Sequence, residues 1–262
     1  MTSQGQKAEA FRALHAGPPF VIPNPWDAGS ARMLAALGFK ALASTSGGFA
    51  FTLGRLDGDV TLDEVVAHVA ALDRATDLPL SVDLENGYGE DPEAAARAIE
   101  TVAEAGAVGG SIEDWDPSGR LYDLSHAVDR VAAAVETARR QPFPFTLTAR
   151  AENHLRGNPD LDDTIARLQA FEAAGADVLY APWLRTTEEV AAVCAALSRP
   201  VNVLAVPGLS FGEIVAAGAQ RVSVGARLTW AAVEAAADAA RRMLDGDFEG
   251  LRKTPPLNDW FG

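Results

Sequence analysis

The feature of the sequence that most restricts its fold is a regular alternation of short apolar runs with amphipathic helical patterns. The apolar runs lie between turn-forming residues and have the composition of buried β-strands. The expected strands are Phe20–Ile22, Ala41–Ser44, Leu80–Leu84, Gly109–Ile112, Phe145–Ala149, Asp177–Tyr180, Val201–Ala205 and Arg221–Val224. The expected helices between and after them cover residues 27–37, 61–76, 91–105, 124–140, 160–174, 186–198, 210–217 and 227–245.

Eight strand–helix units in 262 residues predict an α/β fold, a closed parallel (β/α)8 TIM barrel. A doubly wound open sheet is the alternative, but eight regular units favour closure. No linker or low-complexity segment divides the chain, so we expect one domain over residues 1–262 with a C-terminal helical tail. The last residues of this tail pack either on the same chain or on a neighbouring subunit.

The charge balance and the cysteine content exclude several classes of protein. Lysine and arginine number 22 against 36 acidic residues, a net charge of −14, which disfavours nucleic-acid binding. No run of 18 apolar residues, no signal-like segment and no basic membrane-surface helix is visible, so we expect no membrane partner. Cys194 is the only cysteine, which precludes an internal disulfide and suits a cytoplasmic protein.

Ionisable side chains follow three consecutive strands of the expected barrel at their C-terminal ends. Asp83 and Glu85 share one face of "SVDLENGYG", Glu113 lies in "SIED", and Arg150 lies in "TARAEN". Active sites of TIM barrels lie at these strand ends. Converging carboxylates repel one another unless a cation neutralises them, and Mg²⁺ is a natural choice. For any single carboxylate, a helix cap or an ion pair outside the barrel is the alternative.

A turn of small residues, Ser46, Gly47 and Gly48, follows the second expected strand. Backbone N–H groups of such a turn can bind a carboxylate or phosphate oxygen. Asp57 follows on the same long loop. We therefore expect an anion-binding segment beside the acidic strand ends.

With these motifs in order, the chain resembles the isocitrate lyase/phosphoenolpyruvate mutase superfamily over about residues 18–230. The resemblance rests on "NPWDAGSARMLAALGFKALASTSGG", "LGRLDGD", "SVDLENGYG", "SIED" and "TARAEN". It implies that Mg²⁺, with Mn²⁺ as an alternative, is held partly through water by Asp83, Glu85 and Glu113. The resemblance further implies an active-site aspartate at Asp57, substrate binding by Ser46, Gly47, Gly48 and Arg150, and a polar substrate contact at Asn202.

The same resemblance implies an activity and an assembly. Members of this superfamily act on small anionic 2-oxo and 2-hydroxy acids through enolate-like intermediates. They often exchange a C-terminal helix between subunits. We therefore expect a homo-oligomer, a dimer or a tetramer, with a swapped C-terminal helix.

The chain departs from the lyases of this superfamily in the segment after the fourth expected strand. The lyases carry a catalytic cysteine there, and mutases a lysine and an asparagine, whereas "EDWDPSGRLYDLSH" has neither cysteine nor lysine. Tyr122 is the candidate replacement acid, because its phenol has a usable proton. Cys194 is expected to be a buried small hydrophobic residue.

Three functions remain open at this point. The leading hypothesis is a Mg²⁺-dependent lyase that cleaves a C–C bond, as in an oxaloacetate decarboxylase or a methylisocitrate lyase. The second is P–C bond chemistry, as in phosphonopyruvate hydrolysis or phosphoenolpyruvate mutase action. The third is a 2-oxo-acid binding protein without catalytic activity.

Overall fold

Eight parallel strands form a barrel in the computed structural model, which describes residues 2–251 and 255–261. Neighbouring strands pair in the order β1-β10-β9-β8-β7-β4-β3-β2. The barrel closes between the two ends of this order, where the Ala43 N–H donates a hydrogen bond to the Pro23 carbonyl at 3.0 Å. The predicted (β/α)8 barrel is therefore confirmed. The strands are β1 (Phe20–Ile22), β2 (Leu42–Ala43), β3 (Leu80–Asp83), β4 (Gly109–Glu113), β7 (Thr146–Arg150), β8 (Val178–Tyr180), β9 (Val201–Leu204) and β10 (Arg221–Ser223).

The predicted helices follow these strands with ends set by local capping. Thr61 and Thr186 each close a capping box with a glutamate three residues on, and Pro92 begins its helix at the first position. The barrel helices are α2 (Ala28–Ala36), α4 (Leu62–Ala75), α5 (Pro92–Glu104), α6 (Leu124–Arg140), α7 (Leu161–Ala173), α8 (Thr187–Ala195), α9 (Phe211–Ala216) and α10 (Arg227–Leu244).

Several short elements were not predicted from the sequence. In helix α1 (Gln4–Ala16), Phe11 packs against Ala41 and Val108, which directly precede β2 and β4. Helix α1 therefore covers the end of the barrel at which the strands begin. The other elements that were not predicted are α3 (Ser46–Thr52), the hairpin of β5 (Trp115–Asp116) and β6 (Arg120–Leu121), the 3₁₀ turn η1 (Glu249–Leu251) and α11 (Leu257–Phe261).

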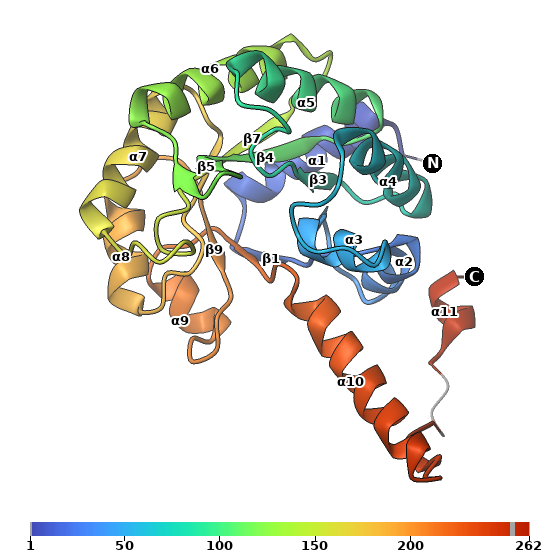
Figure 1. Cartoon of the computed structure of the whole chain (residues 1–262). Helices are drawn as coiled ribbons and strands as arrows, with labels where there is room; N and C mark the ends of the chain where they lie inside the picture. Colours follow the sequence, from blue (N-terminus) through green and yellow to red (C-terminus); the bar gives the residue numbers. More distant parts are fainter. Residues whose placement is uncertain (1, 252–254, 262) are drawn as a thin grey trace.

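Helix α10 extends away from the barrel (Figure 1). Thr229 is its one buried residue, and large hydrophobic side chains such as Trp230 and Leu244 are exposed along it and beyond it. Helix α11 returns to α2, where the Arg32 guanidinium donates to the Phe261 carbonyl at 2.6 Å. The end of the tail thus packs on the same chain, and the predicted exchange of a helix within a homo-oligomer stays a prediction. No helix in the described part of the chain is long and apolar enough to cross a bilayer.

Candidate active site

A cavity of about 180 Å³ opens at the C-terminal ends of the strands and reaches into the barrel. Most TIM barrels fill this interior with branched apolar side chains. Here short polar side chains leave space that suits a small polar ligand. Polar residues and glycines that line the cavity include Asn24, Ser44, Ser46, Gly47, Asp57, Ser81, Asp83, Ser111, Arg150, Tyr180, Asn202, Arg221 and Ser223.

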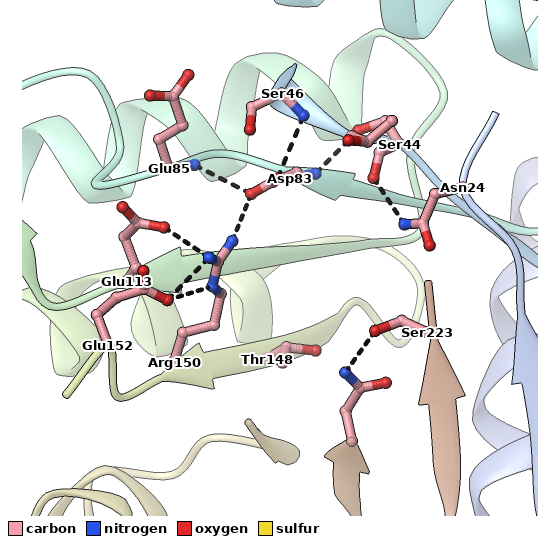
Figure 2. Close-up of polar contacts among 12 residues, drawn as sticks. Asn24, Ser44, Ser46, Asp83, Glu85, Glu113, Thr148, Arg150, Glu152 and Ser223 are labelled. Carbon is pink, nitrogen blue, oxygen red and sulfur yellow. Dashed lines mark hydrogen bonds and ion pairs between the residues drawn. The ribbon is translucent and has the colours of Figure 1, made fainter. Parts of the chain in front are cut away.

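Arg150 lies among three carboxylates at the mouth of this cavity (Figure 2). Its Nη1 is 2.8 Å from Asp83 Oδ1, and its Nη2 is 3.0 Å from Glu113 Oε2 and 2.8 Å from Glu152 Oε1. Burial acts to lower the pKa of Arg150, but the carboxylates outweigh burial and hold this pKa above its usual value. The arginine therefore stays charged and is held in one position by the protein itself.

A second arginine completes the pairing of two of these carboxylates. Arg156 Nη2 is 3.1 Å from Glu113 Oε1, and Arg156 Nε is 3.1 Å from Glu152 Oε2. Both oxygens of Glu113 are thereby engaged by guanidinium groups. Burial, followed by the charge of Glu152, raises the pKa of Glu113 well above its usual value. Sequence reasoning missed Arg156, although its spacing of four residues from Glu152 is a recognisable ion-pair signal.

Two other carboxylates lack such compensation. Burial, and then the charges of Asp83 and Asp57, raise the pKa of Glu85 to about 7. Burial also raises the pKa of Asp57, against the opposing effect of a hydrogen bond from the Ser46 hydroxyl. The Glu85 carboxylate points away from Arg150 in Figure 2. Negative charge is therefore in excess around Asp57, Asp83 and Glu85, and a cation would be favoured there.

The three predicted metal ligands do not form a ready-made cage. Within residues 2–251 and 255–261, no three acidic, histidine or cysteine side chains are grouped as metal ligands. Mg²⁺ retains several waters and needs only one or two carboxylates. Asp57, Asp83 and Glu85 fit a hydrated ion, whereas Glu113 is engaged by its arginines. Metal binding by Asp83, Glu85 and Glu113 stays a prediction.

The predicted turn of small residues is the first turn of helix α3. Thr45 caps it by accepting a hydrogen bond from the Gly48 N–H at 3.4 Å, and the Ser46 N–H donates to Asp83 Oδ2 at 3.3 Å. Ser46 and Gly47 line the cavity. A Cβ at Gly47 would lie 3.4 Å from Asp57 Oδ2, an ordinary van der Waals contact, which places the Asp57 carboxylate close to this turn.

Gly48 serves the packing of α3 and does not line the central cavity. A Cβ at this position would come within 2.6 Å of Thr229 Oγ1 and of Thr45 Cγ2, so no side chain fits there. Gly48 is therefore a packing position in the described structure, and its predicted contact with substrate has no support from the geometry.

Tyr122 also lies outside the central cavity. It is 4% exposed, its hydroxyl accepts a hydrogen bond from Asn86 Nδ2 at 3.0 Å, and the Arg130 guanidinium lies 4.7 Å from its ring centroid. The Tyr122 N–H donates to the Asp114 carbonyl at 2.9 Å, which fixes the chain after the β5–β6 hairpin. The structure places Tyr122 at a separate surface pocket that it shares with Glu85, and not at the cavity of Arg150 and Asp83. Cys194 lies on α8, and burial raises its pKa to about 11.

Asn202 lies deeper in the cavity, as a polar residue of β9. Its Nδ2 donates to Ser223 Oγ at 2.9 Å, and its Oδ1 accepts from Arg221 Nε at 2.8 Å. Both ends of the Asn202 amide thus have protein partners. Its oxygen orients Arg221, which sequence reasoning had not assigned to the site. The signal was present: in "RVSV" the alternation along the strand places Arg221 and Ser223 on one face.

A family model described as phosphoenolpyruvate phosphomutase matches residues 11–244 of the chain. The protein belongs to the phosphoenolpyruvate mutase family. The resemblance noted in the sequence is thereby confirmed, because solved structures of the phosphoenolpyruvate mutase/isocitrate lyase superfamily also match the whole barrel.

Three relatives illustrate the range of this similarity. A crystal structure of a Burkholderia cenocepacia J2315 protein assigned as a lyase/mutase is 51% identical, with a TM-score of 0.95 over 99% of this chain and 96% of that one. The oxaloacetate decarboxylase of Bradyrhizobium diazoefficiens is 32% identical over 207 residues, which cover 74% of this chain and 69% of the relative. Oxaloacetate acetylhydrolase in complex with its product oxalate is 26% identical, with a TM-score of 0.88 over 99% and 94% of the two chains.

Proposed function

We propose that this protein is a Mg²⁺-dependent lyase that cleaves a C–C bond of a small 2-oxo or 2-hydroxy carboxylate, with an oxaloacetate-like acid as the preferred substrate. One observation carries the proposal: the fixed Arg150 lines a single small cavity together with the carboxylates of Asp57 and Asp83. Glu85 lies in an adjoining pocket that shares Asp57, and its pKa is raised to about 7 by burial and by the charges of Asp83 and Asp57. Relatives named for action on oxaloacetate support the choice of substrate.

Arg150 and Gly47 are the residues of the cavity mouth that bind the substrate carboxylate in this proposal. Arg150 offers a fixed positive charge to the substrate carboxylate. Gly47 lines the cavity in the first turn of α3, and its backbone N–H is the second donor that we assign to this carboxylate. The rigid pairing of Arg150 with Asp83, Glu113 and Glu152 keeps this charge in position before substrate arrives.

The acidic group would hold the metal ion. Asp57, Asp83 and Glu85 are the ligands that fit it best, with Glu113 acting through the arginines. A Mg²⁺ ion held there would supply Lewis acidity to polarise the 2-oxo group. In decarboxylation the C–C bond breaks, CO₂ leaves, and the electron pair remains with the 2-oxo fragment. Water in the open cavity then supplies the proton, so the reaction has no need of the cysteine used by the lyases.

The test is a comparison of kcat/KM for oxaloacetate, methylisocitrate and phosphonopyruvate, with EDTA and with Mg²⁺ or Mn²⁺. We expect oxaloacetate to be the best substrate, EDTA to abolish its turnover, and either ion to restore it. The isosteric variant Asp83→Asn is the control for decarboxylation by free metal ion. Full activity of a metal-free preparation would contradict the proposal. Preference for methylisocitrate would require another proton donor, and preference for phosphonopyruvate would indicate P–C chemistry.

A further inference from the structure

The floor of the cavity holds a buried arginine without an acidic partner. Arg221, the first residue of β10, is 5% exposed. Its contacts are Asn202 Oδ1 at 2.8 Å, Thr148 Oγ1 at 3.0 Å and His15 Nε2 at 3.2 Å. All three partners are neutral acceptors, and no ion pair of Arg221 with an acidic side chain is present in the described part of the chain.

This arrangement leaves a full positive charge uncompensated inside the protein. Burial lowers the pKa of Arg221 to about 10, which still keeps it protonated at neutral pH. A buried charge is costly unless it is paired. His15 does not add to the charge, because burial and the nearby guanidinium lower its pKa to about 3. The floor of the cavity therefore favours an anion.

Arg221 faces the same cavity as Arg150. Thr148 accepts a hydrogen bond from Arg221 and precedes Arg150 by two residues on β7. Thr148 and Arg150 therefore lie on one face of this strand, with their Cα atoms about 7 Å apart. A guanidinium has five N–H donors, and the three contacts of Arg221 leave donors for a ligand. The cavity therefore offers one cationic site at its mouth and a second at its floor.

We propose that Arg221 binds a second carboxylate of the substrate and so selects dicarboxylates over monocarboxylates of the same 2-oxo or 2-hydroxy class. The 2-oxo or 2-hydroxy acid end of the substrate lies at the mouth, beside Arg150 and Gly47, and the second carboxylate lies at the floor. The placement of the 2-oxo or 2-hydroxy acid end rests on the function proposed above.

The test measures binding, so that it does not depend on turnover. Lactate and malate form a matched pair in which malate adds one carboxylate to the same 2-hydroxy acid. Dissociation constants are measured by ligand-observed NMR with Mg²⁺ present. We expect malate to bind wild type at least about tenfold more tightly than lactate. Arg221→Met should remove this preference and leave lactate binding unchanged.

Two further variants separate ligand binding from a structural role. Arg221→Gln keeps polar contacts with the neutral partners and should lose the malate preference in the same way. It provides the same test if Arg221→Met does not fold. His15→Gln keeps an acceptor for Arg221 but alters the contact with α1, and should retain the preference. Equal binding of malate and lactate by wild type, or equal weakening of both by Arg221→Gln, would overturn the inference. A malate preference that depends on Arg221 would stand even if no lyase activity were found.

Discussion

Two buried arginines face the same cavity in opposite electrostatic surroundings. Arg150 contacts three carboxylates, whereas the contacts of Arg221 are an amide oxygen, a hydroxyl and a neutral imidazole. At the mouth the protein supplies its own counter-charges, and loss of the arginine leaves carboxylates buried without a cation. At the floor the counter-charge is missing, and loss of the arginine leaves only neutral groups behind. Loss of Arg150 should therefore reduce both stability and substrate binding, whereas loss of Arg221 should mainly reduce ligand binding.

The largest expected effect is the difference in stability between Arg150→Met and Arg221→Met. The first variant leaves Glu113 and Glu152, 6% and 0% exposed, without one of their cations, and should lose about 3–5 kcal/mol of unfolding free energy. The second should lose only about 1–2 kcal/mol, since its partners are neutral. Urea denaturation of both variants measures this difference. Equal losses of unfolding free energy would contradict the proposed difference between the two arginines.

A double variant sharpens this result. Glu152→Gln removes one of the buried charges that Arg150→Met leaves unpaired, so the combination should recover part of the lost stability. Its kcat/KM should remain at least about tenfold below wild type, because the fixed cation at the mouth is still absent. Recovery of activity together with stability would remove Arg150 from the binding site.

The next prediction concerns the pH dependence of stability at the floor of the cavity. The pKa of His15 is lowered from 6.5 to about 3, so the unfolded chain binds a proton below pH 6.5 that the folded protein does not. Stability should therefore fall as the pH drops from 6.5 toward 3, by about 1–2 kcal/mol at pH 5 from this residue. His15→Gln should reduce this loss, as measured by urea denaturation at pH 7 and pH 5. The same acid loss in both proteins would show that the imidazole is accessible to protons.

The smallest effect is expected for Tyr122→Phe. The variant removes the hydroxyl that accepts a hydrogen bond from Asn86 and should cost about 1 kcal/mol of stability. Because the phenol lies outside the central cavity, kcat/KM should change by no more than about twofold. A loss of several orders of magnitude in kcat would return this residue to the role of general acid that the sequence suggested.

The barrel could be predicted from the sequence because its signals are local. Alternation between apolar runs and helical patterns gave all eight barrel strands to within about one residue at each end. Helix α3 was missed, because Gly47 and Gly48 disfavour a helix. The Thr45 cap and the burial of Phe49 and Ala50 override that preference. Such a balance depends on packing between distant segments and cannot be seen in the local pattern.

Several residues of the candidate site could be predicted from the sequence, but the ion pairs between them could not. Strand alternation indicated Asp83 and Arg150, and the family resemblance indicated Asn202; all three line the cavity. The pairing of Glu113 with Arg150 depends on the register of β4 against β7, in which these two residues are direct partners. The position of Tyr122 outside the central cavity could not be predicted, because the β5–β6 hairpin that precedes it has no periodic signal. Arg221 was overlooked because a single charge in a strand is commonly assigned to the surface.

The wall of the cavity is continuous with the helix that leaves the barrel. Gly225 and Ala226 line the cavity, and Ala226 is the N-cap of α10, an 18-residue rod about 27 Å long. For a rod of this length, a lateral shift of about 2 Å at the far end corresponds to a tilt of about 4°, which moves the anchored end by only tenths of an ångström. If α10 pivots as a rigid rod at Ala226, sideways displacement of its exposed length is strongly reduced at the wall of the cavity.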